Sequence, residues 1–137
     1  MNIYFLYDFE IPASLNPAGT LDRIREDLRA YFESRGWDNY GMGALGGSLH
    51  LYGDVSRKNR PVTEQDRLAL GEWARNQRFR GTVRLGAVES GDSHLRKITE
   101  WVFEVDNLSE AERAEADARD AELRQRVEAA RRKPASP

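Results

Sequence analysis

The pattern of apolar and polar side chains predicts five strands and three helices along the chain. Strands are expected where the two kinds of side chain alternate, or where both faces are apolar, because successive residues of a strand point to opposite sides. Helices are expected where apolar residues recur at intervals of three and four. The predicted strands are residues 2–9, 40–45, 48–54, 79–89 and 98–105, and the predicted helices are residues 20–35, 64–76 and 108–133.

Local signals predict how several of these elements are placed, begin or end. Residues 2–9 carry apolar side chains on both faces, which is typical of a central strand rather than an edge strand. Thr20 is predicted to cap the first helix, and Gly36 is predicted to end it, because glycine readily adopts a left-handed backbone. Thr63 and Asp66 have the spacing of a capping box at the start of the second helix.

The predicted elements follow one another in the order β-α-β-β-α-β-β-α, which indicates an α+β fold. The first six resemble the ferredoxin-like βαββαβ arrangement, in which two helices cover one face of an antiparallel sheet. An extra C-terminal strand and a long charged C-terminal helix follow this core. The chain is thus predicted to comprise an α+β sandwich domain (residues 1–106), a charged C-terminal helix (107–133) and a disordered tail (134–137).

The C-terminal helix has little apolar surface to bury. Its apolar content is mostly alanine, and only Leu108, Leu123 and Val127 are larger. Three alternatives therefore stay open for this helix: it packs weakly on the domain, projects from it, or lies in a groove of a partner.

Glycines dominate the middle of the chain. Gly41, Gly43 and Gly46 spell the string G-x-G-x-x-G, which in dinucleotide-binding folds lies between a strand and a helix. Here the string follows a predicted helix and leads into a strand, so no helix N-terminus faces a phosphate at this point. We therefore predict no cofactor, and we interpret residues 41–47 as either a hairpin turn or a bulge in the sheet.

The composition excludes several classes of site. The 137 residues include no cysteine, which excludes disulfides, thiolate catalysis and zinc–sulfur sites. The net charge of −2 gives no overall attraction to nucleic acid or to an anionic membrane. The N-terminal residues include Asp8 and Glu10 and lack the basic start of a signal peptide, and no stretch has the length of a membrane span. A cytoplasmic protein without a membrane partner is therefore expected.

Two residues are weak candidates for chemistry. Asp8 closes the first predicted strand, and His50 lies in the middle of a later strand. The alternative for each residue is a purely structural place, with His50 on a sheet face beside Tyr52 and Asp8 at the end of its strand. His50 and His94 lack the H-x-x-x-H spacing of a metal-binding pair, and no metal site is predicted from them.

A basic loop and the strands beside it supply candidates for binding a partner or nucleic acid. These candidates are Tyr52, Arg57, Lys58, Arg60 and Arg84. An exposed aromatic residue beside cations on an open sheet face is a common way to stack and hold RNA bases. Neighbouring acidic residues weaken the positive field of this group, and a solvated strand face is the alternative reading.

Tyr7 and Asp8 at the end of the first strand, together with the element order, resemble the Cas2 and VapD-like families. The resemblance covers residues 3–8. In those families a matching aspartate is proposed to hold a metal at a dimer interface for nuclease chemistry. The resemblance implies such a role for Asp8, and metal-assisted hydrolysis would need further carboxylates, for which Glu10 and Asp54 are available.

The chain presents no convergent catalytic set, but it does present a long polar helix that its own core hardly needs. We therefore predict a small non-enzymatic interaction or regulatory protein, of the inhibitor or immunity type known from bacteria and phages. It would bind a protein partner through its sheet face and its C-terminal helix. The alternative is a nucleic-acid-binding domain or a metal-dependent nuclease that uses Asp8. A homodimer is compatible with both hypotheses.

Overall fold

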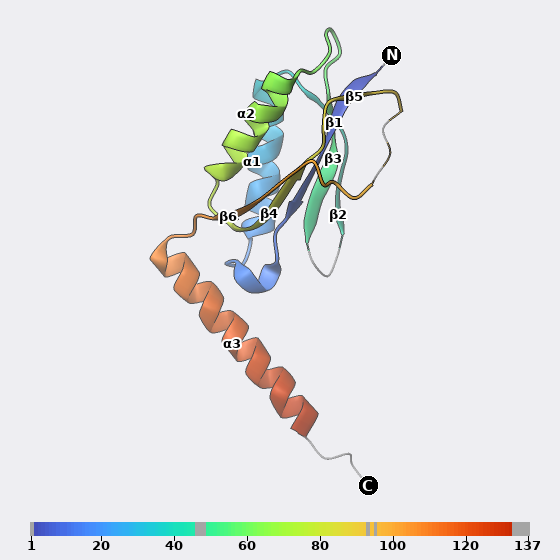
Figure 1. The fold of residues 1–137 in the computed structure, drawn as a ribbon. Coiled ribbons are helices and arrows are strands. Elements are labelled where there is room, and N and C mark those ends of the chain that lie inside the picture. The colour runs from blue at the N-terminus through green and yellow to red at the C-terminus, as the bar shows by residue number, and fades with distance from the viewer. Residues whose placement is uncertain (1, 46–48, 93, 95, 133–137) are drawn as a thin grey trace.

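The computed structural model describes residues 2–45, 49–92, 94 and 96–132, with the backbone alone for residues 39–45 (Figure 1). The strands are β1 (Ile3–Glu10), β2 (Asp38–Leu45), β3 (His50–Ser56), β4 (Arg80–Leu85), β5 (Glu89–Ser90) and β6 (Trp101–Asp106). The helices are α1 (Thr20–Ser34), α2 (Glu64–Arg75) and α3 (Glu110–Arg132), and a short 3₁₀ helix, η1 (Ala13–Leu15), follows β1.

The strands form one antiparallel sheet in the order β2-β3-β1-β4-β6, and the short β5 pairs with the start of β1. β1 is hydrogen-bonded to β3 along one edge and to β4 along the other, which confirms the prediction of a central strand. An α+β fold with an antiparallel sheet is therefore confirmed at this level. The extra C-terminal strand of the prediction is β6, which begins at Trp101 rather than at Ile98.

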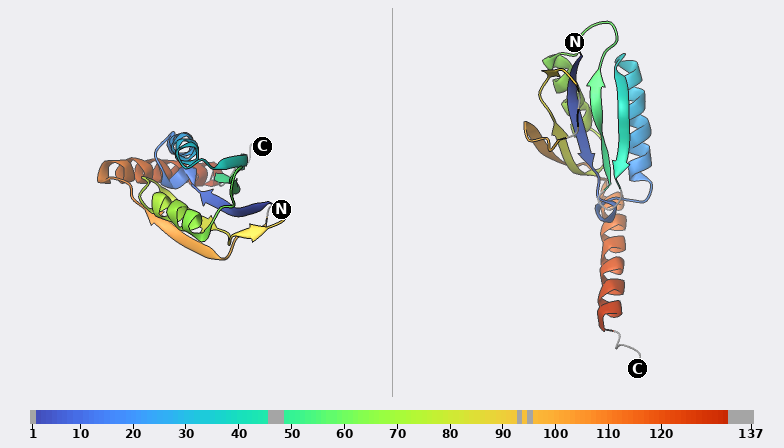
Figure 2. Two further views of the ribbon diagram at one scale, coloured as in Figure 1. Left: turned by 90° about the horizontal axis from the view of Figure 1, so that it is seen from above. Right: turned by 90° about the vertical axis from the view of Figure 1, so that its right-hand side faces the viewer.

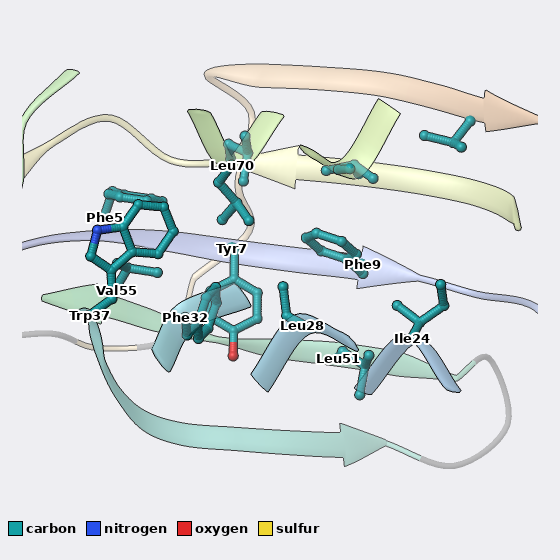
Figure 3. Packing of buried hydrophobic residues seen from close by; sticks show 14 of the residues in the cluster. Phe5, Tyr7, Phe9, Ile24, Leu28, Phe32, Trp37, Leu51, Val55 and Leu70 are labelled. Carbon is teal, nitrogen blue, oxygen red and sulfur yellow. The ribbon is translucent and has the colours of Figure 1, made fainter. Parts of the chain in front are cut away.

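Both α1 and α2 cover the same face of the sheet (Figures 1 and 2). Alternate residues of β1 point to this face, and the side chains of Phe5, Tyr7 and Phe9 are at most 1% exposed. They pack against buried residues of the two helices and of β3, as Figure 3 shows. The helical residues of this core are Ile24, Leu28, Phe32, Leu70 and Ala74.

The opposite face of β1 carries a smaller apolar cluster. Tyr4 and Leu6 lie on this face and are covered by Ile98 from the segment that precedes β6. The alternation of the sequence had placed Ile98 inside the last strand. In the structure the segment before Trp101 instead crosses the sheet, because this position allows Ile98 to bury its side chain against β1.

The helix ends follow the local signals, with one exception. The capping box of Thr63 and Asp66 is confirmed, and Gly36 has the predicted left-handed backbone, with a φ of 68°. The N-cap of α1, however, is Gly19 rather than Thr20. The Thr20 hydroxyl donates to the carbonyl oxygen of Pro17 at 2.7 Å, so Thr20 is the first helical residue and its side chain ties the helix to the preceding loop.

The glycine-rich region lies within the sheet. β2 and β3 are antiparallel neighbours, and Ala44 and Leu45 pair with Leu51 and His50. Their register shifts between Tyr40 and Gly43, which places an irregularity of the bulge type within β2. Residues 46–48, where the turn between the strands was predicted, lie outside the described residues.

One half of α3 is attached to the domain. Ser109 caps the helix: its hydroxyl accepts from the Glu112 amide while the Glu112 carboxylate accepts from the Ser109 amide. Ala116 is fully buried, and the guanidinium of Arg119 donates to the carbonyl oxygens of Ala13 and Asn16, both at 2.7 Å. The C-terminal part of α3 extends away from the sheet (Figures 1 and 2). The helix therefore both packs and projects.

Asp66 joins the start of α2 to the end of β3. Its carboxylate accepts from the Arg57 guanidinium at 2.6 Å and from the Thr63 amide at 2.9 Å, with Arg35 at 3.5 Å. Burial alone would raise the pKa of Asp66, but the hydrogen bonds from Thr63 and the contact with Arg57 outweigh burial and hold the pKa below its ordinary value. The ionised carboxylate therefore stabilises the folded state.

We expect the Asp66→Asn variant to lose about 3 kcal/mol of free energy of unfolding near neutral pH, because it leaves Arg57 without its buried partner. The wild-type contribution is complete above the ordinary aspartate pKa of about 3.9 and is lost as the pH falls through the lower pKa of the folded state. Urea unfolding as a function of pH should therefore show a weaker acid dependence in the variant than in the wild type. Asp22→Asn, at an exposed aspartate of α1, is the matched control, and equal curves for both variants would contradict the expectation.

The approach of β4 to β1 yields a second prediction. A Cβ atom on Gly81 would overlap the carbonyl oxygen of Glu10, whereas a Cβ atom on Gly86 would meet its nearest neighbours at 3.4 Å. Gly81→Ala should therefore lower the free energy of unfolding by about 1–3 kcal/mol, since the central strands must move apart. Gly86→Ala should cost clearly less in the same urea titration. Similar losses for the two variants would be inconsistent with this packing.

Candidate functional site

The face of the sheet opposite the helices brings together polar residues that are far apart in the sequence. In β1 the residues that follow Tyr4 and Leu6 on this face are Asp8 and Glu10. The strand register places Asp8 between Tyr52 of β3 and Arg84 of β4. It places Glu10 beside His50 of β3. The alternation of a strand thus directs these side chains to the open face while their neighbours enter the core.

Four of these side chains form a chain of contacts, which we call the Asp8 network: His50, Asp8, Arg84 and Glu10. His50 Nδ1 lies 2.8 Å from Asp8 Oδ1, and the two side chains are 23% and 21% exposed. Arg84 Nη1 lies 3.4 Å from Asp8 Oδ2 and 2.9 Å from Glu10 Oε1. Each member is therefore held by the next one, and the ring of His50 is held in a defined orientation.

The contact with Asp8 determines which nitrogen of the neutral His50 ring carries the proton and which one can accept a hydrogen bond. A neutral imidazole carries one N–H group and one acceptor nitrogen, and a carboxylate at Nδ1 requires the proton to be on that atom. Nε2 is then left as a hydrogen-bond and proton acceptor. In the described part of the chain, the His50 ring makes its hydrogen bond to Asp8, through Nδ1.

A hollow of about 340 Å³, which we call the sheet-face hollow, opens beside the Asp8 network. Its walls combine apolar, aromatic and polar groups. Leu6 comes from β1, and Arg96 and Ile98 come from the segment that crosses the sheet before β6. The full lining comprises Leu6, Tyr7, Asp8, His50, Tyr52, Gly53, Arg96 and Ile98.

Acidic groups outnumber basic groups around this hollow. Arg84 is bound by two carboxylates of β1, and Arg96 is bound by Glu89 at 3.0 Å and Glu100 at 2.5 Å. Asp54 adds a further negative charge that acts on the hydroxyl of Tyr4. Of the paired side chains, Asp8 and Arg96 line the hollow itself, and the others belong to the ion pairs behind them, in which four carboxylates hold two guanidiniums. The four carboxylates are Asp8, Glu10, Glu89 and Glu100.

Two pKa shifts at the edge of the hollow report the same environment. The pKa of Tyr4 is raised, first by burial and then by the neighbouring Glu89 carboxylate, to which its hydroxyl donates at 3.2 Å. The pKa of Glu100 is lowered, first by its hydrogen bond from Arg96. Tyr4 is thus neutral and Glu100 is charged at neutral pH.

The structure brings together four of the seven residues that the sequence singled out: Asp8, His50, Tyr52 and Arg84 all lie at or beside the sheet-face hollow. The other three, Arg57, Lys58 and Arg60, lie around a separate hollow near the end of β3. Arg57 is 11% exposed and bound to Asp66, and Lys58 Nζ lies 3.9 Å from an oxygen of Asp38. The predicted binding residues therefore divide into two groups.

Sequence reasoning missed Arg96 and Ile98, which form one wall of the hollow. Both lie in a segment without regular secondary structure, and no periodic signal shows where such a segment passes. Their spacing of two residues is compatible with a strand, and the sequence was read in that way for Ile98.

The described residues contain no group of three or more histidine and acidic side chains that could hold a metal ion. Both carboxylate oxygens of Asp8 are engaged, one by His50 and the other by Arg84. The metal role that the Cas2 and VapD-like resemblance implies for Asp8 would require these two contacts to be given up.

Comparisons with family models, with curated proteins and with solved structures yield no match for this chain. No helix in the described part of the chain combines the length and the apolar character needed to cross a bilayer. The functional inference for this chain therefore depends on its own residues and their geometry.

The orientation of His50 can be measured directly. At about pH 8, where a histidine is ordinarily neutral, the His50 ring should carry its proton on Nδ1. Two-bond ¹H–¹⁵N correlation spectra distinguish this tautomer, and Asp8→Ala should shift the ring toward the Nε2-protonated form. His94, which is exposed, serves as the internal reference and should not respond. A ring that is Nε2-protonated in the wild type would contradict the observed contact.

Proposed function

We propose that this protein is a non-enzymatic interaction protein that binds a protein partner through the outer half of α3, residues 120–132. One observation carries this proposal: Leu123 and Val127 lie one helical turn apart and are 54% and 46% exposed. Both follow Arg119, the residue that binds η1, and Leu123 borders a hollow that Ala13 and Ser14 also line. Two large apolar side chains in this position are of no use to the protein's own core. They match the i, i+4 anchors of a helix that enters a groove.

Ion pairs within the helix stabilise the outer half of α3. Three ion pairs join residues one turn apart, between Asp120 and Arg124, Glu122 and Arg126, and Glu128 and Arg132. Such pairs each stabilise an isolated helix by roughly 0.2–0.5 kcal/mol. A helix that is already formed has a smaller entropy cost on binding than a segment that folds on its partner.

The residues around the two exposed side chains favour a different protein over a second copy of this chain. Arg124, Arg126 and Arg131 flank Leu123 and Val127, and the first two are paired with Asp120 and Glu122 of the same helix. If two such helices paired in parallel through this stripe, like residues would face one another, arginine against arginine and glutamate against glutamate, which opposes pairing. An apolar groove with an acidic rim complements the same stripe.

For the domain itself we propose a ferredoxin-like core to which β6 and α3 are added. The order of the first six elements along the chain and the position of both helices on one face support this assignment. Small regulators, inhibitors and immunity-type proteins of bacteria and phages are the class that we propose for the whole chain. The open sheet face is a second surface available to a partner.

A nuclease that uses Asp8 is the second candidate, and the nearby His50 favours it because Nε2 can accept a proton. The local charge of the hollow opposes it, since an excess of carboxylates repels a phosphate backbone. Metal-dependent cleavage of labelled RNA or DNA that disappears in Asp8→Asn would establish this candidate in place of the first.

The partner proposal is tested with the full-length chain carrying Leu123→Glu and Val127→Glu together. We expect the thermal midpoint to stay within the range of the wild type, because both residues lie outside the core, and binding to the partner to weaken at least about tenfold. Leu68→Glu is the matched control, because Leu68 is an exposed apolar residue of α2, 42% exposed.

Quantitative affinity capture from the source cells identifies proteins retained by the wild type and the control but lost with the double variant. Sedimentation of the purified chain distinguishes a second copy as the occupant. Equal retention by all three chains, or a double variant that melts well below the wild type, would overturn the proposal.

A further inference from the structure

We propose that the sheet-face hollow binds the cationic group of a ligand, an ammonium or guanidinium group carried on a short apolar body. This site is separate from the outer half of α3 and consists of other residues. It therefore goes beyond the partner proposal and stands or falls independently of it.

The walls of the hollow match both parts of such a ligand. Leu6 and Ile98 provide apolar surface for the body, and both are buried in the same cluster. Tyr52 adds an aromatic ring to the lining, and the face of an aromatic ring attracts a cation. At about 340 Å³ the hollow lies near the lower end of the range for ligand pockets, so it suits a small molecule or a single side chain.

The Asp8 network supplies the polar anchor. With its Nδ1–H directed to Asp8, His50 presents Nε2 as an acceptor, which suits the N–H groups of a cation. Asp8 is held by Arg84, and Arg84 is held by Glu10, so the acceptor is in place before a ligand arrives. Such preorganisation reduces the entropy that binding must overcome.

The guanidiniums near the hollow are already neutralised, which disfavours an anionic ligand. Arg84 is bound by Asp8 and Glu10, and Arg96 is bound by Glu89 and Glu100. An anion would have to displace a carboxylate from one of them. A cation instead meets the Asp8 carboxylate in the lining and the excess of carboxylates over guanidiniums in the ion pairs around it.

The sign of the ligand charge is tested with matched probes on the full-length chain. Hexylammonium and hexylguanidinium are compared with hexanol and hexanoate, which carry the same body with a neutral or a negative head. NMR titration at millimolar probe concentration should shift the signals of Tyr52 and His50 with the two cations and leave them nearly unchanged with hexanoate. Binding of hexanoate as tight as that of the cations, or no response to either cation, would overturn the proposal.

The residues of the site are tested with His50→Phe, which keeps a ring but removes the acceptor. Binding of hexylammonium should weaken about tenfold, the typical loss for one hydrogen bond to a charged group. His94→Phe is the matched control, because His94 is exposed and lies outside the hollow lining. Should His50→Phe lower the melting temperature, Asp54→Asn removes one negative charge near the hollow and should weaken the same probe several-fold. Unchanged binding in Asp54→Asn and His50→Phe would contradict the site.

A last comparison assigns the source of the cation. A short peptide with one central lysine is titrated against hexylammonium under the same conditions. Tighter binding of the peptide assigns the hollow to a side chain of a protein partner, and tighter binding of the amine assigns it to a small molecule. If the lysine peptide and hexylammonium both fail to bind, the hollow is not a cation site, whatever the outcome for α3.

Discussion

The two-sided pairing and two-sided burial of β1 are the constraint on which the rest of the structure depends. Its edges are hydrogen-bonded to β3 and β4, and its side chains Phe5 and Phe9 are fully buried under α1 and α2. On the other face Tyr4 and Leu6 are also nearly inaccessible. The positions of the helices and of the crossing segment follow from the need to cover this strand.

The same constraint produces the candidate site. Since the residues that alternate with Phe5, Tyr7 and Phe9 must point away from the helices, Asp8 is obliged to lie on the open face, beyond the apolar cluster around Leu6. A carboxylate in that half-buried position requires partners, and the neighbouring strands supply His50 and Arg84. The Asp8 network is thus first a way to satisfy a charge in the sheet. The same contacts also orient the imidazole of His50 beside the sheet-face hollow.

The two halves of α3 make different contacts. Up to Arg119 it serves the domain: Ala116 is buried against it, and the Arg119 guanidinium satisfies two carbonyl oxygens in and after η1. After Arg119 its ion pairs join residues of the helix itself, and Leu123 and Val127 are about half exposed. The contacts with the domain that bury side chains or satisfy carbonyl groups therefore lie in the first half, and Leu123 and Val127 of the second half are available for an interaction.

Features that depend on neighbours along the chain could be read from the amino-acid sequence: the periods of the strands and helices, the Thr63–Asp66 capping box, the left-handed Gly36 and the central position of β1. The contact between His50 and Asp8, 42 residues apart, and the position of Ile98 over Leu6 became visible in the folded chain. The fold also assigned Arg57 to Asp66 rather than to a binding surface. The reason is physical. Periodicity and capping involve residues within one turn or one strand, whereas strand register and loop paths are set by which distant surfaces bury one another.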